Sequence, residues 1–137
     1  MRTKPSITSA DARQILSAAR AEAEKNGWHV TIAVVDESGI LVALERMDAA
    51  FPHTVEIAFH KGRSAATMRL PTKVMEDMVK DRPALVTMPG VTRVQGGLPI
   101  KIGADCIGGV GVSGAASHQD EQVAAAGIAA LATGAPA

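Results

Sequence analysis

Residues 29–47 read HVTIAVVDESGILVALERM, and this stretch decides the fold. Two runs rich in β-branched and aliphatic residues, 29–36 and 40–47, flank the turn-like residues ESG. Two such runs joined by a short connection that contains glycine are typical of a β-hairpin. Asp36 and Gly39 most simply form the turn, since both residue types favour tight hairpin connections.

The same pattern returns later in the chain. LPIKI at 98–102, the turn GAD and CIGGVGVSG at 106–114 predict a second hairpin. Apolar residues at helical spacing, with start and stop signals such as Gly27 and Pro71, predict the helices. These helices cover 9–26, 53–68, a short segment capped by Thr72 that runs through Val79, and a final segment that Ser117 caps.

The predicted order is therefore α-β-β-α-α-β-β-α. The stretch 81–99, with its prolines and glycines, is expected to be mostly loop with at most a helical turn. Because both strand pairs are hairpins, we expect an α+β fold with an antiparallel sheet flanked by helices. The length fits a single domain over 1–137, with an ordered core of about 8–132 and a frayed tail at 133–137.

Composition excludes several function classes. Fourteen basic residues balance fourteen acidic ones, and only three aromatic residues are present, which disfavours nucleic-acid binding. The single cysteine, Cys106, permits no internal disulfide and is expected to be buried and inert. No apolar run is long enough to span a membrane, and the N-terminus lacks the apolar stretch of a signal peptide. A cytoplasmic protein without membrane partners is expected.

The glycine run Gly109-Val-Gly111-Val-Ser-Gly114 matches G-x-G-x-x-G in form. A dinucleotide site needs those glycines between a strand and a crossover helix, whereas here they lie in a hairpin strand. We therefore predict that they permit the close approach of another backbone or of a ligand.

Four polar residues share one face of the helix after Pro52. His53, Glu56, His60 and Arg63 fall within an arc of about 80° at 100° per residue. The opposite side is apolar and must face the core: it carries Val55, Ala58, Phe59, Gly62, Ala65 and Ala66. The polar face is either solvated or a subunit interface, or it binds a ligand, moves protons, or holds a metal through His53 and His60.

Lys61 lies at the border of that polar face. Its simpler interpretation is a stem that packs on the surface while the ammonium reaches water. The alternative is a partly buried base or anion-binding group near the loop that carries Asp48. Met47 and Met88 are haem-ligand candidates, although methionines in an aliphatic-rich chain more often fill the core.

Several segments together resemble the GlcG/HbpS-like family, in its order and over roughly residues 8 to 132: VVDESG, LERMDAA, EIAFHKGRSAAT, QGGLPIKI and GGVGVSGAASHQDEQVAAAGIAAL. The resemblance implies a profilin-like fold and a homo-oligomer with pockets near subunit contacts. HbpS-like members bind haem, a related domain ends some corrinoid adenosyltransferases, and GlcG-like members accompany catabolic operons. The matching family positions are Asp36, Asp48, Lys61, Thr72, Gly96, Gly97 and Pro99. His60, and Gly62 in place of alanine, depart from the family pattern.

Three functions remain open from the sequence. The first is a small-ligand-binding protein, with haem or another tetrapyrrole as ligand. The second is a small catabolic enzyme of the isomerase, lyase or hydrolase type, in which Lys61, Asp48 and His60 carry out acid–base chemistry on a carboxylate-bearing metabolite. The third is a regulatory or structural oligomer. The candidate ligand-binding residues are His53, Glu56, Arg63, Thr72, Arg93, Gly96, Gly97 and Pro99.

Overall fold

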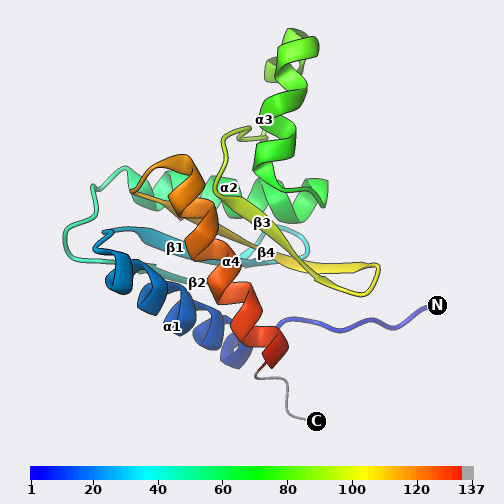
Figure 1. The fold of residues 1–137 in the computed structure, drawn as a ribbon. Helices are drawn as coiled ribbons and strands as arrows, with labels where there is room; N and C mark the ends of the chain where they lie inside the picture. Colours follow the sequence, from blue (N-terminus) through cyan, green and yellow to red (C-terminus); the bar gives the residue numbers. More distant parts are fainter. Residues whose placement is uncertain (134–137) are drawn as a thin grey trace.

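A computed structural model describes residues 1–133, and the order of its elements confirms the predicted α+β arrangement. Residues 134–137, most of the predicted frayed tail, lie outside the described part. Figure 1 shows the elements, whose bounds are α1 Ser9–Asn26, β1 Thr31–Asp36, β2 Leu41–Arg46, α2 Thr54–Met68, α3 Thr72–Asp81, the 3₁₀ helix η1 Pro83–Thr87, β3 Gly97–Ile102, β4 Asp105–Ser113 and α4 Ser117–Thr133.

The strands form one antiparallel sheet in the order β2-β1-β4-β3. Each predicted hairpin is present, and β1 pairs with β4 in the centre, where Thr31 lies opposite Ser113. The first hairpin closes as expected: the Asp36 carboxylate accepts hydrogen bonds from the backbone N–H groups of Ser38 and Ile40, at 2.9 and 3.0 Å. Gly39 takes the left-handed conformation there, with φ 79°.

Helices cover the two faces of the sheet unequally. The main core lies between the sheet and the pair α1 and α4, where Ile32 and Val34 of β1 pack with Ile15 and Val123. Successive side chains of a strand alternate between faces, so Ala33 and Val35 point to the side covered by α2. The residues of β1 from Thr31 to Val35 are all buried, as expected for a central strand with helices on both sides.

Glycines allow α2 to lie directly on β4. A Cβ atom added at Gly111 would overlap the carbonyl oxygen of Ala58, and one at Gly109 would overlap that of Gly62. In the other direction, a Cβ at Gly62 would lie 2.9 Å from the backbone nitrogen of Gly111. The prediction of a close backbone approach at the glycine run is therefore confirmed.

The helix α3 departs from its prediction at its start. Pro71, not Thr72, is the N-cap residue, and Thr72 is the buried first residue of the helix. The Thr72 hydroxyl instead accepts a hydrogen bond from the backbone N–H of Gly97 at 2.8 Å, so it ties α3 to β3. Beyond this anchor, α3 projects away from the layers, followed by η1 (Figure 1).

None of the helices within residues 1–133 is long and apolar enough to cross a lipid bilayer.

Candidate functional site

Lys61 is buried, which corrects the interpretation of a surface lysine. Its exposed fraction is 2%, and its ammonium donates to the carbonyl of Val112 at 3.0 Å and to the carboxylate of Asp120 at 3.2 Å. The side chain enters the protein because small residues of α2 let that helix lie close to β4. Asp120 belongs to α4, 59 residues away, and lies in the C-terminal segment that resembles the family, but it was not among the candidate site residues.

Asp120 completes this buried ion pair from the first turn of α4. Its second carboxylate oxygen accepts a hydrogen bond from the backbone N–H of Ala115 at 2.9 Å. Burial raises the pKa of Asp120, while the Ala115 hydrogen bond and the Lys61 charge act in the opposite direction. The ion pair joins α2 to α4, and the hydrogen bond from Lys61 to Val112 adds β4 to the same contact. A substrate outside the protein cannot reach the buried ammonium of Lys61 without displacing this pair.

The glycines of the QGGLP turn pack around Lys61. A Cβ at Gly96 would lie 2.7 Å from the Lys61 ammonium nitrogen, and one at Gly97 would overlap the Lys61 carbonyl oxygen. Gly97 is also the donor to Thr72. Lys61, Thr72, Gly96 and Gly97, four of the family positions, thus form one buried cluster.

Asp48 does not join this cluster. It is exposed in the loop after β2 and takes part in none of the hydrogen bonds or ion pairs described for residues 1–133. The acid–base arrangement expected from sequence, with Asp48 as the partner of Lys61, is replaced by the pair of Lys61 with Asp120.

The polar face of α2 is exposed, whereas the expected core face is only partly buried. Glu56, His60 and Arg63 are exposed, and His53 lies 3.9 Å from Glu56 as an exposed pair. Opposite them, Val55 and Phe59 are half-buried instead of belonging to the core. The remaining four residues expected on the core face are buried: Ala58, Gly62, Ala65 and Ala66.

The predicted metal pair gains no support from the geometry. His53 and His60 are seven residues apart, which corresponds to about 10 Å along a helix axis. Within the described part of the chain, no three histidine, cysteine or acidic side chains group as metal ligands.

His60 and Arg63 instead line a polar hollow of about 320 Å³ with the loop residues Gly90, Val91 and Thr92. Arg93 follows in the same loop, and its guanidinium donates to the carbonyl of Met75 and the sulfur of Met88, both at 3.3 Å. Pro99 lies elsewhere, in a shallow apolar hollow of about 480 Å³ between β3 and α4.

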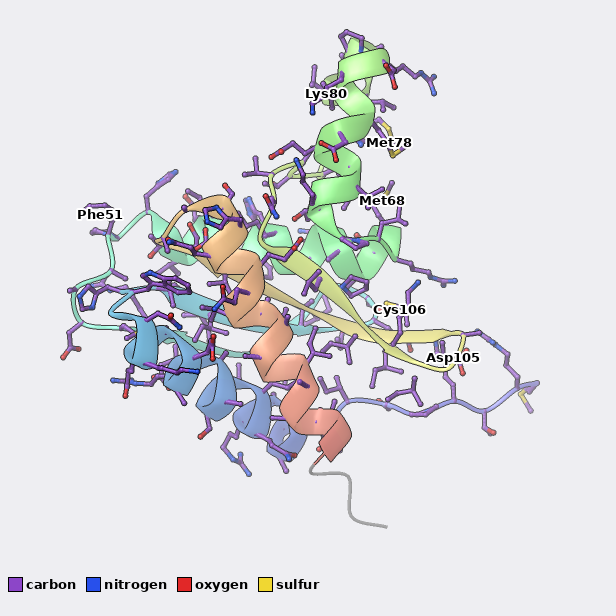
Figure 2. The ribbon with its side chains drawn as sticks, viewed as in Figure 1. Phe51, Met68, Met78, Lys80, Asp105 and Cys106 are labelled. Carbon is purple, nitrogen blue, oxygen red and sulfur yellow. The ribbon has the colours of Figure 1, made fainter. Side chains whose placement is uncertain are left out.

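A further hollow, of about 250 Å³, is lined by residues that were not among the candidate site residues predicted from the sequence. Its wall contains the chain's one tryptophan, a histidine and one of its two phenylalanines: Trp28, His29 and Phe51. Phe51 is 73% exposed and projects from the loop before α2 (Figure 2). The sequence signal was the Trp-His pair directly after the glycine that ends the first helix.

Local backbone contacts fix this aromatic hollow at one end of the sheet. The N–H groups of Trp28 and Gly27 donate to the carbonyls of Ala23 and Glu24, at 2.9 and 3.1 Å, which is the Schellman ending of a helix. Gly114 closes the other side, because a Cβ there would overlap the carbonyl oxygen of His29. The backbone that carries the indole and the imidazole is therefore held between the end of α1 and the start of β1.

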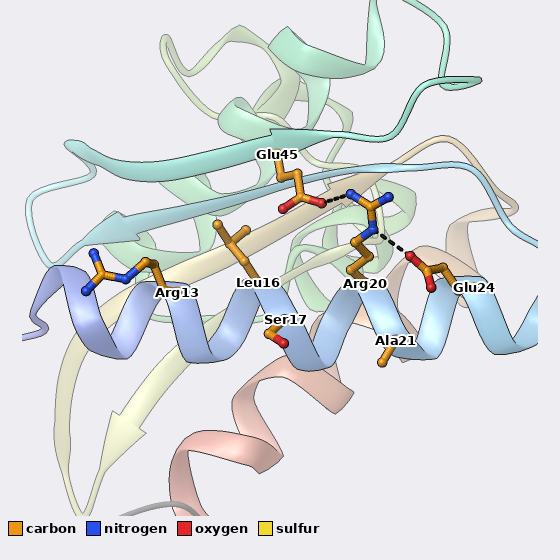
Figure 3. Close-up of a pocket in the computed structure, with 7 residues that line it drawn as sticks. All are labelled: Arg13, Leu16, Ser17, Arg20, Ala21, Glu24 and Glu45. Atoms are coloured by element: carbon orange, nitrogen blue, oxygen red, sulfur yellow. Dashed lines mark hydrogen bonds and ion pairs between the residues drawn. The ribbon is translucent and has the colours of Figure 1, made fainter.

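A hollow of about 500 Å³ between α1 and β2 is less suited to a ligand. Figure 3 shows Arg20 in its wall, between the carboxylates of Glu24 and Glu45. The hydrogen bonds that the guanidinium donates to these two carboxylates raise the pKa of Arg20. Because the guanidinium already has two anionic partners, it serves to tie α1 to β2.

The sulfur-containing candidates take ordinary structural places. Cys106 is buried, as predicted, with its sulfur 3.6 Å from the carbonyl oxygen of Ala66. Met47 is buried in the main core and accepts a hydrogen bond from the Val30 N–H. Met88 is exposed and contacts Arg93.

Comparison with known proteins agrees with this architecture. The family model "Haem degrading protein HbpS-like" matches residues 7–129. Protein GlcG of Escherichia coli strain K12 is 45% identical over 114 residues, which cover 82% of this chain and 85% of GlcG.

Solved structures give the same relationship. A double mutant of HbpS from Streptomyces reticuli is 34% identical, with a TM-score of 0.88 over 94% of this chain and 89% of that one. The PduOC–haem complex is 27% identical, with a TM-score of 0.84 over 92% and 95% of the two chains. With the family model matched over most of its length, the chain belongs to the HbpS-like family.

Proposed function

We propose that this protein binds a haem-type tetrapyrrole against the aromatic hollow formed by Trp28, His29 and Phe51. The observation that carries the proposal is the convergence of Trp28 and Phe51, two of the chain's three aromatic residues, with His29 in one hollow. The similarity to a protein whose structure contains haem supports the class of ligand.

The residues of the hollow fit such a ligand chemically. Aromatic rings provide large apolar faces on which a planar macrocycle can stack, and an exposed phenyl ring gains when it is covered. Phe51 is such a ring, and Ala49 and Ala115 extend the apolar wall. The macrocycle is larger than the hollow of about 250 Å³, so part of it would remain outside the wall.

His29 is the histidine best placed to bind the iron. Imidazole is a common axial ligand of haem iron. The side chain is exposed and takes part in none of the hydrogen bonds described for residues 1–133. By contrast, His53 stands beside Glu56, and the His60 ring contacts the Phe59 ring, with centroids 5.6 Å apart, at a hollow lined otherwise by Arg63 and residues 90–92.

A bound haem would supply the ligand-binding and redox chemistry of its iron, while the protein orients the ring and limits the access of water. Trp28 and Phe51 would hold the ring face, and Gln119, at the rim, offers an amide to a polar substituent.

Titration with hemin tests this proposal. We expect a saturable Soret band with one hemin per chain, and we expect His29→Ala to shift the band and weaken binding by about tenfold or more, because the iron loses its ligand. The matched controls are His53→Ala, His60→Ala and His118→Ala, which also remove exposed imidazoles. A band that persists unchanged in His29→Ala, or that responds to one of the controls instead, contradicts the assignment.

We also propose that the protein associates with copies of itself through the projecting arm of α3 and η1. Three apolar side chains of this arm are exposed, those of Val74, Met78 and Val86. Met88, the residue directly after η1, is exposed as well. Val74 and Met78 are four residues apart and so share one face of α3 (Figure 2 labels Met78). An exposed apolar patch rimmed by charged residues is typical of a protein–protein contact.

Light scattering at micromolar concentration tests the arm. We expect a mass well above the 14.1 kDa of one chain, and we expect Met78→Glu to reduce it, because a buried carboxylate would have no partner in the contact. Ile40→Glu is the control, since Ile40 is 63% exposed at the tip of the first hairpin. A monomeric wild-type protein, or equal masses for all three proteins, contradicts the proposed contact.

A further inference from the structure

The polar hollow beside α2 has properties that the haem proposal does not use. It is lined by His60, Arg63, Gly90, Val91 and Thr92, and it shares no residue with the aromatic hollow. No acidic side chain lines it. Its charge is therefore positive.

Arg63 is the source of that charge, and the stem of its side chain is packed. Its stem packs against the turn of the first hairpin, where a Cβ at Gly39 would lie 2.8 Å from the Arg63 Cγ. Among residues 1–133, no carboxylate lies within ion-pair distance of its guanidinium, in contrast to Arg20 between its two glutamates. An exposed guanidinium whose stem is packed and which lacks a counter-ion is suited to bind an anionic group, to which it can donate two parallel hydrogen bonds.

The opposite wall is attached to the same helix. The buried Ser64 hydroxyl accepts a hydrogen bond from the backbone N–H of Thr92 at 2.8 Å, which holds the loop against α2. A Cβ built at Gly90 would meet no atom within 4 Å, so the loop backbone is open to close approach. The Thr92 hydroxyl and the His60 imidazole provide additional hydrogen-bonding groups at the wall.

We infer that this hollow is a binding site for the carboxylate or phosphate group of a small metabolite, with Arg63 as its charged anchor and His60 as a second contact. The inference goes beyond haem binding and does not depend on it. From the sequence, Lys61 was the candidate anion-binding group of α2. Because Lys61 is buried, the inference gives that role to the exposed His60 and Arg63 on either side of it. The volume of about 320 Å³ has room for the anionic group of a small molecule.

The test uses inorganic phosphate, acetate and succinate as probes, in calorimetric and NMR titrations of the intact protein at constant ionic strength. We expect saturable binding of at least one probe, with shifts at His60 and Thr92. Stronger binding of phosphate identifies a phosphorylated ligand, and stronger binding of acetate or succinate identifies a carboxylate. Arg63→Met keeps an unbranched stem beside Gly39 and removes the charge. It should lower the affinity for the preferred probe by about tenfold, because one charge-assisted contact is lost.

Two further variants separate a site from a general charge effect. His60→Gln should weaken the same probe, whereas Arg46→Met removes an exposed arginine outside the hollow and should leave binding unchanged. All three positions are exposed, so the fold should survive, and circular dichroism checks this. Binding that does not saturate for any probe, or that falls equally in Arg63→Met and Arg46→Met, overturns the inference. Hemin binding is measured in the same variants and should not change.

Discussion

Lys61→Met is expected to lower the free energy of unfolding by about 3–5 kcal/mol, because it leaves the Asp120 carboxylate buried without its ion partner. The methionine fills most of the space of the lysine stem, so the loss comes mainly from the unpaired charge. Urea denaturation followed by circular dichroism measures the change. Lys73→Met is the matched control, since Lys73 pairs with Glu76 and Asp77 at the surface and should matter little.

A double substitution checks the cause. Lys61→Met combined with Asp120→Leu removes both buried charges and should recover much of the lost stability, since apolar replacement of a whole buried pair is often neutral. If the double variant is destabilised by the sum of the two single changes, the residues are not coupled and the ion pair is not the reason. If Lys61→Met is as stable as the wild type, the buried contact itself is wrong.

Gly111→Ala is expected to have a comparably large effect, at least about 3 kcal/mol, because the new methyl group would overlap the backbone of α2. The atoms it meets are the carbonyl oxygen of Ala58 and the nitrogen of Gly62, which cannot move without separating α2 from β4. Thermal and urea denaturation measure the loss.

Gly103→Ala provides the comparison for that substitution. Gly103 lies in the turn between β3 and β4, and a Cβ there meets no atom within 4 Å. Only its left-handed φ of 60° is unfavourable for alanine, which costs about 1 kcal/mol. Equal losses for Gly103→Ala and Gly111→Ala would contradict the close packing of α2 on the sheet.

The fold was predictable because its signals are local. The two runs rich in β-branched residues within 29–47, Gly27 at the end of α1 and Pro71 before α3 all act through the backbone of their own segment. The glycine run was also interpretable, since three glycines in a buried strand indicate a close approach.

The candidate site was harder to predict from the sequence, because its contacts join segments that are far apart in the chain. Nothing in the spacing around Lys61 indicates that the first turn of α4 will supply Asp120. Likewise, Trp28, Phe51 and Gly114 meet only because the end of α1, the loop after β2 and the end of β4 lie at one end of the sheet. Helical periodicity did identify His60 and Arg63 as neighbours on one face of α2. It says nothing about the loop at 90–92, which lies outside the helix and completes their hollow.

The two hollows offer different chemical groups for binding a ligand. The aromatic hollow offers apolar faces and one imidazole, which suits a planar ring with a metal. The polar hollow offers a guanidinium and a second imidazole, which suits a small anion. Because they share no lining residue, substitutions in one should leave ligand binding at the other intact.

The most direct test of the proposed haem site is a crystal structure of the protein with bound hemin. We predict that the macrocycle lies against Trp28 and Phe51, with the iron coordinated by an imidazole nitrogen of His29. A structure in which hemin instead lies on the exposed face of α2, with His53 or His60 on the iron, or in which His29 remains free in solvent, would contradict the account.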